Sequence, residues 1–312
     1  TDNTAVGRYG TLMANTTGSY NIAIGRDALT SNTTASNNTA VGYRAMKQTT
    51  TGASNVAMGY WALHNNTTGT NNAAFGYEAL KSNTTASNNT AVGFFSLKAN
   101  TTGSPHVAVG YEALKANTTG ASNMAVGYRA MYTNTTGGGN TGLGYQTLYS
   151  NTTGSANEAV GVNALFANTT GTYNIAMGTN ALTANTTGAE NVSVGNNALS
   201  TNVDGWRNTA VGHYAMKVNT SSHGTALGND AMLANTTGAE NTAVGSQSLY
   251  ANTTGGQNIA MGYKALFSNT TASNNTALGY DALRLNITGA DNTAVGYGTL
   301  AANLTGGNTA VG

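Results

Sequence analysis

The sequence predicts an all-β fold, a parallel β-solenoid or β-roll of about 18 coils with a 17-residue repeat, and three observations predict it. A phrase close to Asn-Thr-Ala-Val-Gly-Tyr-x-Ala-Leu-x-x-Asn-Thr-Thr-Gly recurs throughout the 312-residue chain. Apolar residues hold fixed places around its glycine, and charged residues are only 7% of the total. A short period over a whole chain is typical of repeat architectures, in which each unit packs on its neighbours. Residues 1–312 therefore read as a single repeat domain, and we expect a fragment of a longer fibre.

The repeat is defined by its glycine, which we take as position 0. Fifteen of the 18 intervals are 17 residues, the interval from Gly7 to Gly25 is 18, and those ending at Gly228 and Gly312 are 16. The glycines at position 0 are Gly7, Gly25, Gly42, Gly59, Gly76, Gly93, Gly110, Gly127, Gly144, Gly161, Gly178, Gly195, Gly212, Gly228, Gly245, Gly262, Gly279, Gly296 and Gly312.

The residues before each glycine predict a short strand. Position −1 is always apolar, and position −2 is Ala in nearly every repeat. Side chains in a strand alternate between faces, so positions −3, −1 and +1 share one face and positions −2 and 0 share the other. We expect the face that carries position −1 to form the core. We expect the small Ala–Gly face to let another chain approach closely, as in a homotrimer.

The residues after the glycine predict a second segment and a turn. Position +4 is Leu or Met in every repeat if Leu12 of the first repeat is allowed a one-residue shift, and we expect this column to be buried with position −1. The Asn-Thr-Thr-Gly that follows is typical of turns. Because a turn interrupts every repeat, we expect no helix longer than one turn.

Stacked coils bring identical residues into columns about 4.8 Å apart. Asn at position −4, as in Asn38, Asn55 and Asn72, predicts a ladder in which the side-chain amides bond to one another. Aromatic residues at position +1 predict a second ladder, read either as packing or as a surface for sugar rings. The tyrosines that could bind a ligand there are Tyr43, Tyr60, Tyr77, Tyr111, Tyr128 and Tyr145.

Two other features are candidate sites. The stretch that contains Asp204, Trp206 and Arg207 departs from the repeat, and Trp and Arg favour it as a binding or inter-subunit contact. The Asn-x-Thr/Ser signal at the corner reads either as turn capping or as N-glycosylation. It occurs at Asn15, Asn32, Asn66, Asn83, Asn100, Asn117, Asn134, Asn151, Asn168, Asn185, Asn219, Asn235, Asn252, Asn269, Asn286 and Asn303.

Composition argues against several functions. A net charge of +1 predicts no electrostatic footprint, that is, no positively charged surface that would attract nucleic acid. No apolar run is long enough to insert in a membrane. Without cysteine there are neither disulfides nor thiolate metal sites. The four histidines occupy different repeat positions, so we expect no metal and no cofactor. Glu78 and Glu112 both lie at position +2, which we read as a solvated face rather than a catalytic pair.

The core phrase resembles the head repeat of YadA-like trimeric autotransporter adhesins, and also the arrays of bacterial and phage tail-fibre-type proteins. It is carried by Thr4-Ala5-Val6-Gly7, Ile22-Ala23-Ile24-Gly25 and Val107-Ala108-Val109-Gly110. The resemblance implies a left-handed roll that assembles as a homotrimer on a cell surface or virion tail. The repeat here is longer than the adhesin's, and its Asn lies one residue closer to the glycine, so no collagen-binding role is carried over.

The sequence thus predicts an extracellular structural fibre, an adhesin or tail-fibre shaft, that partners with itself as a trimer or filament. Its repeated sites would attach to surface glycans or a host surface by multivalency, without catalysis. Two alternatives are an ice-binding solenoid and a glycosylated self-assembling filament. Both ends of the sequence carry the repeat phrase without a polar cap. We therefore expect end-to-end stacking or a longer native chain.

Overall fold

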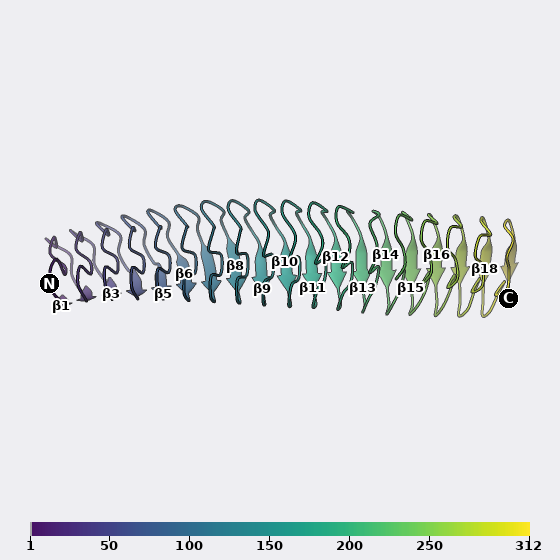
Figure 1. Ribbon diagram of the computed structural model, residues 1–312, viewed down its shortest axis with the longest axis horizontal. Coiled ribbons are helices and arrows are strands. Elements are labelled where there is room, and N and C mark those ends of the chain that lie inside the picture. The colour runs from purple at the N-terminus through teal and green to yellow at the C-terminus, as the bar shows by residue number, and fades with distance from the viewer. Residues whose placement is uncertain (1) are drawn as a thin grey trace. The chain divides into compact units, whose positions relative to one another are not determined.

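The computed structural model describes residues 2–312 as two compact units, the first ending at Ala156 and the second spanning Asn157–Gly312. Each unit is a stack of similar coils, and each coil contributes one short parallel strand (Figure 1). The all-β solenoid with its repeat of about 17 residues is therefore confirmed. No helix among residues 2–312 has the length and apolar character needed to cross a membrane.

In the first unit, each strand pairs with the strand of the next coil, from β1 through β9. The register joins equivalent repeat positions, so that Ala23 lies opposite Ala40 and Ala40 opposite Ala57. The strands are β1 (Thr4–Val6), β2 (Ile22–Ile24), β3 (Thr39–Val41), β4 (Val56–Met58), β5 (Ala73–Phe75), β6 (Asn89–Val92), β7 (His106–Val109), β8 (Asn123–Val126) and β9 (Thr141–Leu143).

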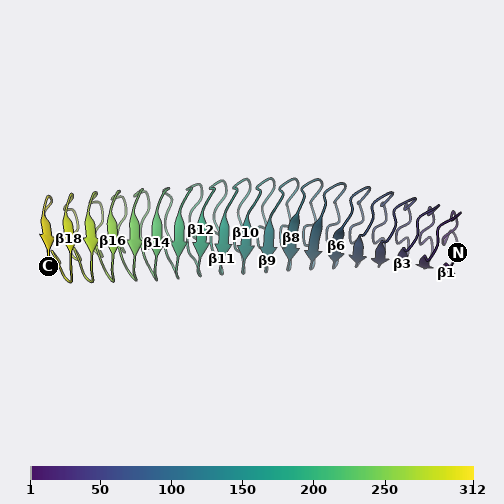
Figure 2. The same ribbon diagram turned by 180° about the vertical axis from the view of Figure 1, so that it is seen from behind.

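The second unit repeats this pattern from β10 through β19, again with parallel pairing between successive coils. Seen from behind, the strands within each unit still point in one direction (Figure 2). They are β10 (Glu158–Val160), β11 (Ile175–Met177), β12 (Val192–Val194), β13 (Thr209–Val211), β14 (Thr225–Leu227), β15 (Thr242–Val244), β16 (Ile259–Met261), β17 (Thr276–Leu278), β18 (Thr293–Val295) and β19 (Thr309–Val311).

The assignment of strand faces from the sequence was wrong. Alanines at position −2, such as Ala108, are fully buried inside the coil, whereas residues at position −1, such as Met58 and Val92, lie on the outside at about 40% exposure (43% and 37%). The column at position +4 is buried as predicted, with Leu97 and Met131 as examples. The Ala–Gly face therefore packs within its own chain and is not available to a second one.

The narrow interior of the coil explains this reversal. The strand and the segment that returns opposite it lie close together, so position −2 meets the side chain at position +4. A Cβ added at Gly142, one of the exceptions at position −2, would lie 2.9 Å from Oγ1 of Thr147 and 3.1 Å from Cε of Met131. The space at position −2 is therefore limited to a small side chain such as Ala, and a valine there would be too large.

Left-handed backbone conformations form the corners of the coil. Residues at positions +2, +4 and +12 have positive φ, for example Arg44 at 55°, Met46 at 49° and Ser54 at 60°. Side chains branched at Cβ avoid this conformation, which accounts for the restriction of position +4 to Leu and Met. The glycine at position 0 is needed for a second reason. At Gly25, φ is 121°, and a Cβ would lie 2.7 Å from the carbonyl oxygen of Gly42.

Two ladders of buried asparagine hold each stack together. At position −4, Asn55 accepts a hydrogen bond on Oδ1 from the backbone N–H of Asn72 at 2.9 Å and donates from Nδ2 to the carbonyl of Gly69 at 2.9 Å. At position +7, Asn83 donates to Oδ1 of Asn66 at 2.9 Å and to the carbonyl of Ala86 at 2.9 Å. The predicted ladder at position −4 is thus confirmed, and a second one runs beside it.

Candidate binding surface

One edge of the first unit carries the predicted aromatic ladder. Seven rings at position +1, from Tyr43 to Tyr145, are stacked with centroids 4.9–5.4 Å apart. Tyr60, Tyr77 and Tyr111 are about 40% exposed (40%, 41% and 42%). A shorter ladder of Tyr263, Tyr280 and Tyr297 lies in the second unit.

The ring geometry limits what this ladder can bind. Interplanar angles of 3–9° join Phe94 to Tyr111, Tyr111 to Tyr128 and Tyr128 to Tyr145, so neighbouring rings cover each other's faces. A sugar that stacks on an aromatic side chain needs a free face. The ladder therefore supports the packing interpretation, and it presents ring edges rather than a sugar-stacking platform to solvent.

Cationic side chains border the ladder at positions +2 and +5, a feature that the sequence analysis did not single out. The guanidinium of Arg44 lies 5.0 Å from the ring centroid of Tyr43, and that of Arg129 lies 5.2 Å from that of Tyr128. The ammonium of Lys81 is 4.1 Å from the Trp61 ring, and that of Lys98 is 3.9 Å from the Phe95 ring. These cation–π contacts join positions +1, +2 and +5 into one surface.

Glu78 and Glu112 lie within this surface, and the expectation of a solvated face for them was wrong. Both are buried, at 8% and 4% exposure. Each is held by two cations from its own and the next coil. Glu78 contacts Lys81 at 3.3 Å and Lys98 at 2.8 Å. Glu112 contacts Lys115 at 2.7 Å and Arg129 at 2.8 Å.

These ion pairs set the protonation of the two carboxyls. Burial raises the pKa of Glu112, but hydrogen bonds from Lys115 and Arg129 outweigh it, and the net pKa is lowered. The pKa of Glu78 is lowered for the same reason, through Lys98 and Lys81. Both side chains therefore stay ionised at neutral pH, and neither is poised to donate a proton as a general acid.

The irregular stretch in the second unit forms an exposed cluster. Trp206 is 42% exposed, the guanidinium of Arg207 lies 4.5 Å from its ring centroid, and the His223 ring meets it edge-on at 4.6 Å. Arg207 also pairs with Glu190 at 2.8 Å. Asp204 is exposed, but no contact places it with the other four residues. The structure thus brings together two of the three predicted residues and adds His223 and Glu190.

The predicted glycosylation sites lie in the inner ladder, which conflicts with modification of the folded chain. Nδ2 of Asn100, for example, donates to Oδ1 of Asn83 at 3.2 Å and to the carbonyl of Gly103 at 3.0 Å. A glycan on that nitrogen would break these bonds and has no space. Asn15 and Asn303 are only half-buried. The asparagines of this kind that are at most 1% exposed are Asn32, Asn66, Asn83, Asn100, Asn117, Asn134, Asn151, Asn168, Asn185, Asn219, Asn235, Asn252, Asn269 and Asn286.

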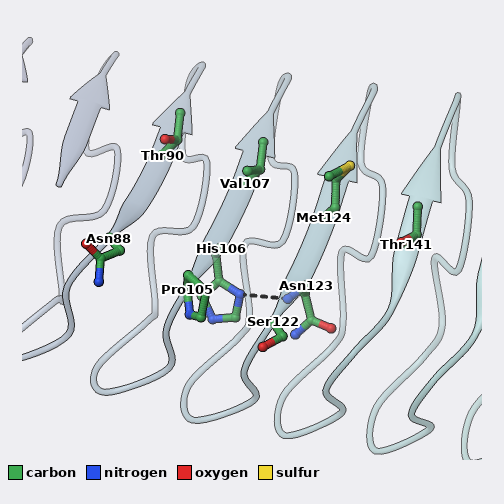
Figure 3. A pocket seen from close by; sticks show the side chains of 9 residues that line it. All are labelled: Asn88, Thr90, Pro105, His106, Val107, Ser122, Asn123, Met124 and Thr141. Carbon is green, nitrogen blue, oxygen red and sulfur yellow. Dashed lines mark hydrogen bonds between the residues drawn. The ribbon is translucent and has the colours of Figure 1, made fainter. Parts of the chain in front are cut away.

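A histidine replaces asparagine at position −4 of one coil. Nδ1 of His106 accepts a hydrogen bond from the Asn123 N–H at 3.2 Å, as Oδ1 of Asn55 accepts one from the Asn72 N–H. Its side chain borders an open hollow of about 320 Å³ on the outer face of β6–β9. There Thr90, Val107, Met124 and Thr141 stand side by side, one from each strand (Figure 3). Among residues 2–312, no three His, Asp or Glu side chains gather in a way that could hold a metal ion.

Comparison with known proteins leaves the structure as the main guide. The sequence matches no protein-family model, and no curated protein matches it significantly.

Proposed function

We propose that this chain is a structural module of an extracellular fibre, which assembles side by side with identical chains, as a homotrimer, and serves attachment rather than catalysis. The observation that carries this proposal is the outer face of the strands. Its column at position −1 is apolar in every coil, and position −3 beside it is Thr in ten coils and aliphatic in eight, as in Ile22 and Ile24 of β2 or Ile259 and Met261 of β16.

This outer face is the surface that association would cover. Isolated exposed apolar residues are ordinary, but a contiguous apolar column such as position −1 marks an interaction surface. Ile24, Met58 and Met261 are each about 40% exposed (39%, 43% and 39%). A copy of the same chain offers columns with the same spacing, so a match at one coil repeats at the next. The resemblance of the core phrase to trimeric adhesin heads supports three copies.

The proposal is tested by placing charge on the outer face. The triple variant Val92→Glu, Val109→Glu and Val126→Glu adds one carboxylate to each of three adjacent strands. We expect the unmodified protein to sediment as a trimer at micromolar concentration and the variant to sediment as a monomer with unchanged circular dichroism. An unmodified protein that sediments as a monomer would refute this function.

A matched control separates a specific face from a general effect of charge. Thr85, Thr102 and Thr119 lie on the exposed corner of the same three coils. The triple variant Thr85→Glu, Thr102→Glu and Thr119→Glu adds the same charge there, and we expect it to remain assembled. Dissociation of both variants would show that charge repulsion alone, rather than the outer face, controls assembly.

A further inference from the structure

The few charges of this chain are distributed unevenly. Residues 2–156 hold eight Lys and Arg but four Asp and Glu, a net charge of +4, whereas residues 157–312 hold four and seven, a net charge of −3. The total of +1 hides this difference, and the sequence-based expectation of no electrostatic footprint relied on the total alone.

All eight cations of the first unit belong to one edge. They occupy positions +1, +2 and +5, the positions joined by the aromatic ladder and its cation–π contacts. We call this surface the cationic edge, and its cations are Arg8, Arg26, Arg44, Lys47, Lys81, Lys98, Lys115 and Arg129. Three carboxylates share it, Asp27, Glu78 and Glu112, so the cationic edge carries a net charge of +5.

The cations of this edge remain accessible although several are paired. Side-chain exposure is 56% for Arg26, 30% for Lys98 and 32% for Arg129. Each glutamate is shared between two cations, so every group of three keeps one positive charge. Tyrosine hydroxyls at the ring edges can add hydrogen-bond donors along the same line.

We propose that the cationic edge binds an acidic polysaccharide, a linear chain of sulfated or carboxylated sugars that runs along the coils. The cations recur at the coil spacing of about 4.8 Å, so a linear polyanion meets a new positive charge at nearly every step. Arg and Lys bind sulfate and carboxylate groups, and Arg can do so with two parallel hydrogen bonds.

The geometry of the ladder favours a polysaccharide over a nucleic acid. Proteins that bind single-stranded nucleic acid stack its bases on free aromatic faces. The faces of Tyr111, Tyr128 and their neighbours are covered by one another. What remains outward is a row of ring edges and hydroxyls between cations, which suits the hydroxyl and acidic groups of a sugar chain.

This inference names what the fibre would attach to, so it rests on the proposed function. Its test measures polysaccharide binding directly and does not require the chains to assemble. Binding of fluorescent dextran sulfate to the full chain is measured at several salt concentrations, with uncharged dextran and oligo-dT as competing ligands. We expect dextran sulfate to bind, with an affinity that falls as salt rises from about 50 to 200 mM because counterions are released. We expect dextran not to bind and oligo-dT to bind more weakly.

Two variants locate the binding site, because one should weaken and the other should strengthen the affinity for dextran sulfate. Arg26→Gln with Lys47→Gln removes two positive charges from the cationic edge, and we expect roughly tenfold weaker binding at low salt. Glu78→Gln with Glu112→Gln frees the cations that these carboxylates neutralise, and we expect tighter binding. A folding defect could not produce that gain. The control Lys217→Gln with Arg284→Gln removes two charges from the second unit and should change the affinity by less than about twofold.

Three results would overturn the inference: no binding of dextran sulfate at low salt, tighter binding of oligo-dT, or no gain from the two glutamine substitutions. Sedimentation of the same samples reports self-association separately. A trimer that does not bind dextran sulfate would refute only the polysaccharide inference. A monomer that binds dextran sulfate would refute only the assembly.

Discussion

His106 occupies an asparagine position in the inner ladder, and its Nδ1 accepts the backbone N–H of Asn123 at 3.2 Å. The neutral imidazole therefore carries its proton on Nε2, and the ring also bonds to the Gly120 backbone. The ring reproduces the acceptor of the amide that it replaces, but unlike an amide it can take up a proton. This substitution makes one coil sensitive to pH.

Acid should weaken the fold through this residue. Burial lowers the pKa of His106 to about 4, and its hydrogen bonds oppose that shift. Because the folded-state pKa lies below the unfolded value of 6.5, the stabilisation is complete above pH 6.5 and is lost as pH falls toward 4. We expect the free energy of unfolding to drop by about 2–3 kcal/mol more in the wild type than in His106→Asn between pH 7.5 and 4.5. Equal pH dependence in both proteins would contradict the prediction.

The inner and outer positions of one strand should respond oppositely to charge. Ala108→Glu places a carboxylate in the closed interior, where we expect a loss of more than about 4 kcal/mol or failure to fold. Val109→Glu lies on the outer face, where we expect a loss below about 1 kcal/mol in the dissociated chain. Chemical denaturation measures both. A tolerated Ala108→Glu would show that position −2 is accessible after all.

The asparagine ladder should be sensitive to a single deletion. Asn55→Ala removes the acceptor of both the backbone N–H and Nδ2 of Asn72, and it takes one of two side-chain donors from the Gly69 carbonyl. We expect a loss of about 2–4 kcal/mol, because buried partners are left unsatisfied. Thr51→Ala, on the exposed corner of the same coil, is the matched control and should stay within about 0.5 kcal/mol. Hydrogen exchange at the Asn72 amide should rise only in the first variant.

The ionisation of Glu112 should depend on its two cations. Its carboxyl should titrate below 4.5 in the wild type, since Lys115 and Arg129 overcome the effect of burial. Stabilisation from this group is present above that value and is lost as pH falls through the folded-state pKa. In Lys115→Met with Arg129→Met, burial acts alone, and the midpoint should move above 4.5. Carbon NMR of the side-chain carboxyl reads out both values.

Repeat periodicity was sufficient to predict the coils, the strand at positions −3 to −1 and the asparagine ladder, because each follows from stacking identical units. Periodicity could not show which strand face points into the coil, because the alternation of side chains defines two faces without showing what packs against each. The relevant signal lay in the variation among repeats. Position −2 stays almost constant as Ala, as a tight interior requires, whereas position −1 varies between residues as different as Val92 and Phe75.

The candidate surface was only partly predictable. The aromatic column was visible in the sequence, but the covering of each ring by the next depends on the side-chain rotamers. The pairing of Glu78 with Lys98 crosses from position +2 of one coil to position +5 of the next, a relationship that needs the stacking direction. Counting charge in each half separately would have found the excess of cations without any structure.

The asparagine ladders also make each unit electrically directional. Nδ2 of every bonded member donates to Oδ1 of the coil before it, as in Asn117 to Asn100 in the first unit and Asn185 to Asn168 in the second. Amide dipoles aligned in this way add up, as peptide dipoles do in a helix, and polarise one another. A stack therefore has a donor end and an acceptor end. A coil that stacks on the acceptor end can donate its Nδ2 hydrogen bond to the Oδ1 atom there. Growth by stacking is therefore favoured in one direction.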